Sequence, residues 1–204
     1  MTRLSDREFR AMNNPMRQAF QRLVEFPLLQ WFGVPVTGRD VLEVGCGSGY
    51  GAQLLRTLSP HAYMGLDFMP EQVSLADKRL PEATFIVQDA ADMKDIPSSS
   101  QDTVVVFGVL HHILEWREAI SEIARVLRPG GDVFLEEPDG SIISLFDGLF
   151  HWGHPVTFRL SELEDSLTTS GFRIVRRLCA LGFGIYRLQS LPVGSGQFQE
   201  TCSG

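Results

Sequence analysis

Three glycines at alternate positions are the first residues whose type and spacing indicate chemistry. Gly45, Gly47 and Gly49 follow a short apolar stretch and precede a segment with helical spacing. Glycine adopts backbone dihedrals that other residues avoid, and it lets the main chain come close to a ligand. A strand that passes through such a turn into a helix predicts a nucleotide-type site. The pattern alone is weak, because glycine-rich turns also serve purely as structure.

Three carboxylates strengthen the prediction. Glu43 stands two residues before the first glycine, where it can accept hydrogen bonds or lie near an amine. Asp67 follows the turn by about 20 residues, the spacing at which an acidic residue reaches both ribose hydroxyls. Asp89 ends a third apolar stretch, and the small Ala90 beside it leaves room for an adenine edge. Each alone is also compatible with a solvated strand end or a helix cap, but together they favour a nucleoside site.

Histidines are the candidate proton acceptors, because imidazole titrates near neutrality. His111 and His154 are predicted as catalytic bases; the alternative for the adjacent pair His111 and His112 is that one of them packs against its own loop. His151 and Trp152 lie in an aromatic-rich stretch that would either cover an acceptor or bury itself against the core.

Polar residues near the N-terminus, Arg10, Asn14 and Arg17, are predicted to bind substrate, with a solvated helix face as the alternative. Cys46 lies inside the glycine turn, where packing is favoured over a nucleophilic role. No metal site is expected, since two adjacent histidines have no carboxylate partner at metal-ligand spacing.

Alternating apolar and helical segments must position these residues. Strands are predicted over residues 41–44, 62–66, 84–87, 103–109, 132–136, 172–178 and 184–188. Helices are predicted within 1–30, with a second one opening at Pro15 and a break at Pro27, and over 52–58, 70–78, 116–127 and 160–170; Arg128–Gly131 reads as a turn. This order predicts an α/β fold whose mostly parallel sheet has helices on both faces. The short spacing of the last two strands predicts a closing antiparallel hairpin.

Composition limits the alternatives. A chain of 204 residues suits one domain, predicted over 1–190, with a helical cap over 1–37, a possible lid over 138–160 and a disordered tail over 191–204. A net charge of −7 argues against nucleic acid as partner. Three unpatterned cysteines and a charged N-terminus favour a cytoplasmic protein, and no apolar run reaches the roughly 18 residues of a membrane span.

The stretch VLEVGCGSGYG resembles the first motif of class I S-adenosylmethionine (SAM)-dependent methyltransferases, particularly the small-molecule "type 11" group. Asp67 and Asp89 match the acids on the ribose and adenine sides in that family. The segment from Phe107 to His112 resembles the part after the fourth strand that lines the methionine half of SAM, and Leu127–Gly131 resembles the turn before the fifth strand.

This resemblance implies a Rossmann-like fold with a seven-stranded sheet, and SAM as the cofactor, with S-adenosylhomocysteine as product. The predicted cofactor-binding residues are Glu43, Gly45, Cys46, Gly47, Gly49, Asp67, Phe68, Asp89, Ala90, Gly108 and Leu110. The predicted function is in-line transfer of a methyl group to an oxygen, nitrogen or carbon atom of a small, partly apolar metabolite. The alternatives are a nicotinamide-dependent oxidoreductase and a non-catalytic SAM-binding partner protein.

Overall fold

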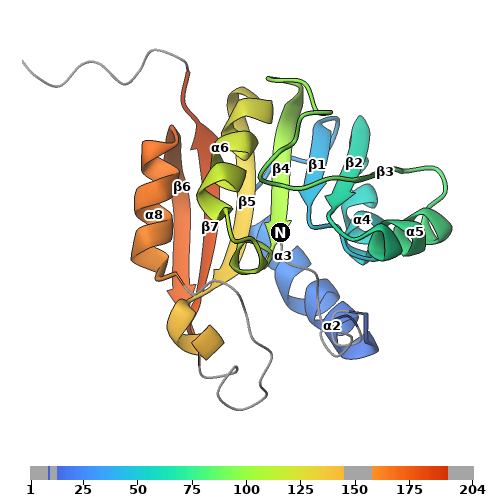
Figure 1. Ribbon diagram of the computed structural model, residues 1–204, viewed down its shortest axis with the longest axis horizontal. Helices are drawn as coiled ribbons and strands as arrows, with labels where there is room; N and C mark the ends of the chain where they lie inside the picture. The colour runs from blue at the N-terminus through green and yellow to red at the C-terminus, as the bar shows by residue number, and fades with distance from the viewer. Residues whose placement is uncertain (1–8, 10–12, 145–157, 193–204) are drawn as a thin grey trace, which may run out of the picture.

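The computed structural model describes residues 9, 13–144 and 158–192. Its centre is a seven-stranded sheet in the order β3-β2-β1-β4-β5-β7-β6 (Figure 1). The strands are β1 (Asp40–Val44), β2 (Ala62–Asp67), β3 (Thr84–Val87), β4 (Gln101–Phe107), β5 (Leu127–Pro138), β6 (Phe172–Ala180) and β7 (Phe183–Ser190). Strand β7 pairs antiparallel with both β5 and β6, and the remaining pairs are parallel. The predicted fold class, including the closing hairpin, is therefore confirmed.

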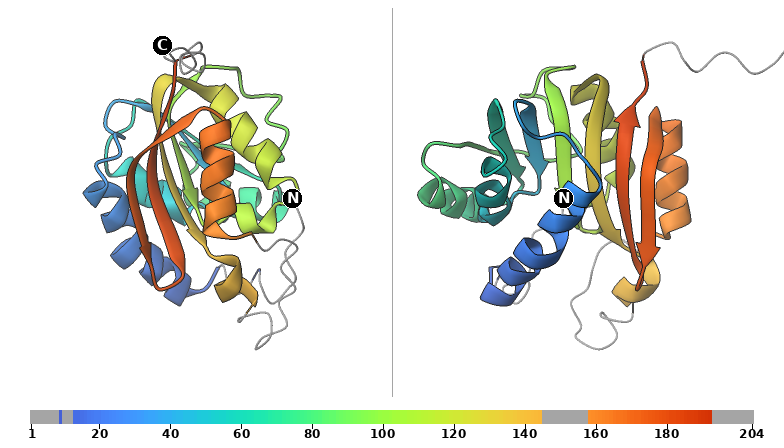
Figure 2. Two further views of the ribbon diagram at one scale, coloured as in Figure 1. Left: turned by 90° about the vertical axis from the view of Figure 1, so that its left-hand side faces the viewer. Right: turned by 180° about the vertical axis from the view of Figure 1, so that it is seen from behind.

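Helices cover both faces of this sheet (Figure 2). They are α2 (Pro15–Phe20), the π-helix η1 (Gln21–Glu25), α3 (Phe26–Trp31), α4 (Tyr50–Arg56), α5 (Pro70–Arg79), the 3-10 helix η2 (Leu110–His112), α6 (Trp116–Val126) and α8 (Leu160–Thr169). One apolar cluster lies between the sheet and α6 with α8, and a second lies between the sheet and α3 with α4. Strand β4 is buried on both faces, as its run of valines predicts.

Two predicted boundaries in the middle of the chain were wrong. Strand β4 ends at Phe107 rather than at residue 109, because Gly108 takes a left-handed φ of +62° and turns the chain out of the sheet. Residues 128–131 do not form a separate turn. They belong to β5, which begins at Leu127 opposite Gln101 and resumes regular pairing at Asp132 after a register shift.

The expected helix break at Pro27 is also wrong. The backbone stays helical from Pro15 to Trp31, and the amide of Phe26 donates to the carbonyl of Gln21, five residues earlier. This π-turn shifts the hydrogen-bond pattern, so that Pro27 lies in the first turn of α3, where its missing N–H costs no helical bond.

The face of this N-terminal helix that packs against the protein is not the one that its apolar residues predict. The spacing of Ala19, Leu23 and Phe26 would place these apolar residues on one inward face, yet Leu23 is 72% exposed. The buried positions are Gln21, Glu25 and Leu29, each four residues apart. The helix therefore presents polar groups to the interior, which is unusual for a purely structural element.

A small set of contacts holds the N-terminal helix against the sheet. Phe32, at the end of α3, is buried and meets Phe134 of β5 edge to face with ring centroids 6.2 Å apart. The guanidinium of Arg176 on β6 lies 4.8 Å from the Trp31 ring centroid and donates to the Trp31 carbonyl. The helix is thus attached at its C-terminal end to the antiparallel side of the sheet.

Replacing Phe32 tests this attachment. Phe32→Ala leaves a cavity against Phe134, and we expect a loss of about 3–5 kcal/mol in the free energy of unfolding. Because the same helix walls the pocket described below, ligand binding should weaken as well. Urea titration measures the first effect and calorimetric titration with S-adenosylhomocysteine the second. Leu181→Ala, at a position that is 93% exposed, is the control. Unchanged ligand affinity in a destabilised Phe32→Ala protein would contradict the link.

Candidate active site

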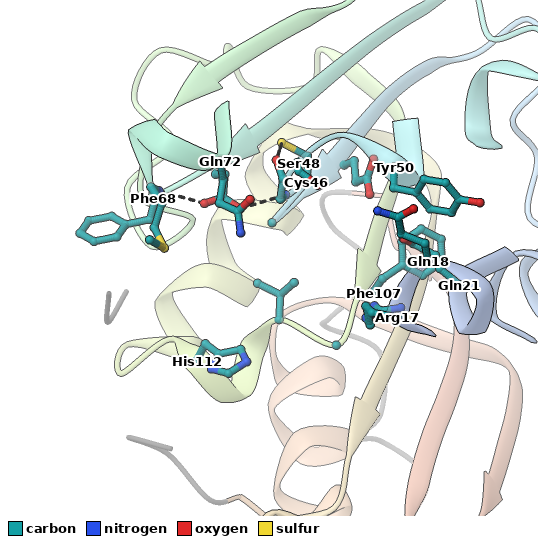
Figure 3. Close-up of a pocket in the computed structure, with 17 residues that line it drawn as sticks. Arg17, Gln18, Gln21, Cys46, Ser48, Tyr50, Phe68, Gln72, Phe107 and His112 are labelled. Atoms are coloured by element: carbon teal, nitrogen blue, oxygen red, sulfur yellow. Dashed lines mark hydrogen bonds between the residues drawn. The ribbon is translucent and has the colours of Figure 1, made fainter. Parts of the chain in front are cut away.

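A pocket opens at the carboxyl ends of β1, β2 and β4, where parallel α/β sheets bind ligands (Figure 3). The N-terminal helix closes its other side. The lining residues are Arg17, Gln18, Gln21, Glu43, Gly45, Cys46, Gly47, Ser48, Tyr50, Asp67, Phe68, Met69, Gln72, Phe107, Gly108, Val109 and His112. The N-terminal helix and the loops after β1, β2 and β4 thus contribute residues to one pocket.

The glycine turn follows β1 and is fixed by hydrogen bonds to β2. The amides of Gly45 and Cys46 both donate to the Leu66 carbonyl, at 2.8 and 2.9 Å. Gly45 has a φ of +71°, and a Cβ atom there would collide with Val109. A Cβ on Gly47 would meet none of the described atoms within 4 Å. Glycine is therefore needed at residue 45 because the turn packs closely against Val109. At residue 47, glycine leaves the main chain accessible to a ligand.

Asp67, the last residue of β2, is held by two backbone amides. Its Oδ2 accepts from Gly47 at 3.0 Å and its Oδ1 accepts from Met69 at 2.9 Å. Burial raises the pKa of this carboxyl, while the two amides oppose the rise by stabilising the charged form. The two amides fix the orientation of the carboxylate, and its remaining lone pairs can accept hydrogen bonds from hydroxyl groups. Both properties are expected of a ribose-binding acid.

Glu43 is 2% exposed and lies on the pocket wall between helices. Its Oε2 accepts from the Tyr63 hydroxyl at 2.5 Å. Burial raises the pKa of Glu43 to about 8, and the hydrogen bond from Tyr63 limits the rise. A Cβ on Gly51 of α4 would overlap the other carboxylate oxygen of Glu43, so glycine at residue 51 makes room for this side chain. A buried acid with a raised pKa is suited to receive a cationic ligand group.

Arg17 brings a positive charge to the same pocket. Its Nη1 lies 2.9 Å from Oε2 of Glu25, which is buried on η1. The carboxyl group of Glu25 is in turn hydrogen-bonded to that of Glu136 on β5. Burial and the nearby charge of Glu25 raise the pKa of Glu136 well above its ordinary value, and burial also raises the pKa of Glu25. The chain from Glu136 through Glu25 holds the Arg17 guanidinium at the wall.

His111 forms a buried pair with Glu137. Its Nδ1 lies 2.9 Å from Oε2 of Glu137, whose Oε1 accepts the amides of Val109 and Leu110 at 2.7 and 2.6 Å. Burial raises the pKa of Glu137 to about 8, and the backbone amides oppose the rise. Because these partners are donors, they favour the ionised carboxylate. Glu137 thereby fixes both the loop after β4 and the imidazole ring.

Of the predicted cofactor-binding residues, the structure brings seven to this pocket: Glu43, Gly45, Cys46, Gly47, Asp67, Phe68 and Gly108. Arg17, predicted to bind substrate, lies with them. Cys46 is buried, and burial raises its thiol pKa, in keeping with a packing role.

Four other predicted cofactor-binding residues do not line it. Gly49 is the N-cap of α4, where an added Cβ would lie 3.0 Å from Ala76. Asp89 accepts the Ala91 amide at 2.9 Å, and Ala90 and Leu110 are fully buried in the core.

Predicted catalytic and substrate residues have varied positions. His111 does not line the pocket, but His112 does. Asn14 caps α2 by accepting the Arg17 amide at 2.8 Å. Arg10, His151, Trp152 and His154 lie outside the described residues, as does the tail from residue 193. Both flanks of the predicted lid are described: Asp139 accepts the amides of Ser141 and Leu160, each at 3.0 Å.

Several lining residues were missed from the sequence, notably Gln18, Gln21, Ser48, Tyr50, Met69 and Gln72. The spacing of Arg17, Gln21 and Glu25 along one helix face was a usable signal. By contrast, the sequence carries no mark that places Gln72 beside Asp67, since that proximity depends on how α5 begins.

Comparison with known proteins gives the family. The family model described as "Methyltransferase domain" matches residues 42–135. These residues form a class I SAM-dependent methyltransferase domain. The match confirms the resemblance found in the sequence, and it identifies SAM as the cofactor of the family. The acidic wall, Asp67 and the apolar side chains around the pocket suit a cationic nucleoside of this kind.

Individual relatives of this chain are also named as methyltransferases. A Mycolicibacterium smegmatis protein named as a SAM-dependent methyltransferase is 34% identical over 160 residues, covering 78% of this chain and 62% of its own length. The phthiotriol/phenolphthiotriol dimycocerosates methyltransferase of Mycobacterium tuberculosis is 41% identical over 101 residues, covering 48% of this chain and 37% of its own. The chain therefore spans less than two thirds of these relatives.

A solved SAM-dependent methyltransferase from Mesorhizobium loti shares the fold, with a TM-score of 0.70, 16% identity and coverage of 81% of this chain and 97% of the other. Within the described residues, no helix is long and apolar enough to cross a membrane, and no group of three or more potential ligands is arranged to hold a metal ion.

The raised pKa of Glu43 leads to a prediction about pH. The charged form of Glu43 becomes populated as pH rises through about 8, so affinity for an amine-bearing nucleoside should rise between about pH 6.5 and about pH 8.5. Glu43→Gln should bind S-adenosylhomocysteine about tenfold more weakly at the upper pH and differ little at the lower one. Calorimetric titration at three pH values measures both.

Glu82→Gln is the control for this experiment, because Glu82 is an exposed carboxylate paired with Arg56 outside the pocket. Wild type and Glu43→Gln with parallel pH dependences would show that Glu43 does not contact the ligand's charge.

Proposed function

We propose that this chain transfers the methyl group of SAM to an oxygen, nitrogen or carbon atom of a small, partly apolar molecule. The observation that carries the proposal is the Asp67 carboxylate, pinned by the amides of Gly47 and Met69 on the floor of a pocket that also holds Glu43. Such an arrangement suits a ribose diol at one end and an ammonium group at the other. The family match supports the same reading.

The chemistry of the reaction comes mainly from the cofactor, which supplies an activated methyl group on a sulfonium. The protein must orient the acceptor and exclude water. Asp67 and Glu43 would fix the two ends of the nucleoside amino acid, and Arg17 lies where a carboxylate can be received. The apolar side chains of Phe107 and Val109 line the pocket between these polar ends, so they would keep water from the reacting atoms.

A partly apolar acceptor is supported by the surroundings of the pocket and by one relative. Phe68 and Met69 add apolar surface on the β2 side. The M. tuberculosis relative is named for action on dimycocerosates of phthiotriol. That name describes the relative; for this chain, it supports testing apolar alcohols and phenols first.

Proton removal is proposed for the pair His111 and Glu137. Gly108 lines the pocket, and a Cβ on it would lie 3.9 Å from Cε1 of His111 and 3.4 Å from Oε2 of Glu136. Glu137 orients the imidazole through Nδ1 and would stabilise an imidazolium, as a carboxylate does in a catalytic dyad. An acceptor hydroxyl or amine beside Gly108 would release its proton toward this ring.

Ligand binding and group transfer test the main proposal. We expect micromolar binding of S-adenosylhomocysteine in a calorimetric titration, and transfer of label from methyl-labelled SAM to small molecules of an extract. Folded, cofactor-free protein that binds NAD but not S-adenosylhomocysteine would favour the oxidoreductase alternative. Binding without transfer to any acceptor would favour a partner protein, and label found on protein alone would contradict a small-molecule acceptor.

The role of His111 gives a further prediction. His111→Ala should lower turnover by about 10²-fold or more while S-adenosylhomocysteine affinity is retained, because the base acts only in transfer. The loss should shrink with an acceptor that is already ionised at the assay pH. His61→Ala is the matched control, since His61 also pairs with a carboxylate, Asp40 at 2.6 Å, but at the opposite end of the sheet. Equal turnover of His111→Ala and wild type would remove this residue from the reaction.

A further inference from the structure

Gln72 is a buried amide whose presence the fold does not explain. It is the third residue of α5, it is 2% exposed, and it lines the pocket. Its Oε1 has no hydrogen-bond partner among the described residues. Leaving a buried acceptor unpaired costs free energy, whereas an apolar side chain of the same size costs none. Retaining glutamine here destabilises the folded chain unless a ligand supplies the missing partner.

The neighbours of Gln72 on its helix show that polarity is not needed for packing. The other buried residues of α5 are Val73 and Ala76, both apolar. Ala76 lies one turn after Gln72 on the same face and packs against the turn at Gly49. A methionine or leucine at residue 72 would continue this apolar face. The amide is thus surplus to the packing of α5 on the sheet.

Backbone contacts fix Gln72 relative to Asp67. The Gln72 amide donates to the Met69 carbonyl at 3.0 Å, while the Met69 amide donates to Asp67 at 2.9 Å. Both side chains are therefore tied to one short turn. Gln72 and Asp67 both line the same pocket, in which Figure 3 labels Gln72. A group bound by Asp67 therefore lies in the same pocket as this amide.

The two side chains differ in what they can offer a ligand. A carboxylate accepts hydrogen bonds, whereas a carboxamide both donates and accepts. A ribose hydroxyl can donate one hydrogen bond and accept another. If Asp67 were the only partner, the hydroxyl oxygens of the buried diol would accept no hydrogen bond. The Gln72 amide supplies a donor for the diol and gains a donor for its own oxygen.

We propose that Gln72 is a cofactor-positioning residue, which hydrogen-bonds the ribose hydroxyls held by Asp67 and makes the site selective for ribose over deoxyribose. This inference rests on the proposed function and refines it. Its consequence is geometric: a second contact on the ribose fixes rotation of the nucleoside about the Asp67 carboxylate, and so the direction of the methyl group.

The test compares S-adenosylhomocysteine with its 2′-deoxy and 3′-deoxy analogues on wild type, Gln72→Met and Gln101→Met. Gln101 is a buried glutamine at the start of β4, the opposite end of the sheet from the pocket, and Gln101→Met is the matched control. We expect Gln72→Met to bind S-adenosylhomocysteine about tenfold more weakly, the loss of one hydrogen bond. It should also discriminate less against at least one deoxy analogue than wild type does.

Thermal unfolding without ligand separates binding from folding. Gln72→Met should unfold at the same temperature as wild type or higher, because an unpaired buried amide is removed. Equal affinity of Gln72→Met and wild type, or an equal loss for all three ligands, would overturn the inference. If Gln72→Met unfolds at lower temperature, Gln72→Leu provides the same comparison of ligands. Wild type that does not bind S-adenosylhomocysteine would overturn the proposed function, and this inference with it.

Discussion

Burial of carboxyl groups at one edge of the sheet is the constraint on which this structure depends. Burial raises the pKa of five of them, namely Glu25, Glu43, Asp67, Glu136 and Glu137. They are accommodated in three ways. Backbone amides hold Asp67 and Glu137, a tyrosine hydroxyl holds Glu43, and Glu136 is hydrogen-bonded to Glu25. The turns after β1, β2 and β4 are shaped by these bonds, so the acids organise the site as well as line it.

The amino edge of the same sheet shows the contrast. There Arg128 bridges Asp40 and Asp102 at 3.0 and 2.7 Å, and His61 joins Asp40. The hydrogen bond from His61 lowers the pKa of Asp40, so this acid is an ordinary carboxylate paired near solvent. At the carboxyl edge, burial instead raises the pKa of the acids, because it disfavours their charged forms. Because a bound cation favours the ionised acids, the edge is electrostatically prepared for a sulfonium and an ammonium group.

Sequence patterns predicted the sheet well and the pocket wall poorly, for a physical reason. Strand β3 was predicted with its observed bounds, because short apolar runs and glycine turns are local signals. The continuous helix through Pro27 was missed because it depends on a π-turn. Which residues of that turn face the interior is decided by tertiary contacts, which a local pattern does not contain. The inward face of that helix follows Gln21 and Glu25 rather than Leu23. Glu25 interacts with Glu43 of β1 and Glu136 of β5, which lie far away in the sequence. Local hydrophobicity cannot report a polar interface of this kind.

The division between local and distant signals also explains why the cofactor is easier to infer than the acceptor. The family match at residues 42–135 contains the glycine turn, Asp67 and the loop after β4, all built on the neighbouring strands β2, β1 and β4 of the sheet. Arg17, Gln18 and Gln21 lie before that match, on a helix held to the sheet by Phe32 and Arg176. Asp139 ties the two flanks of the segment that follows β5. These parts lie outside the residues that the family model matches, so the match itself carries no information about them. Acceptor choice is therefore to be sought in the elements that local sequence patterns describe least.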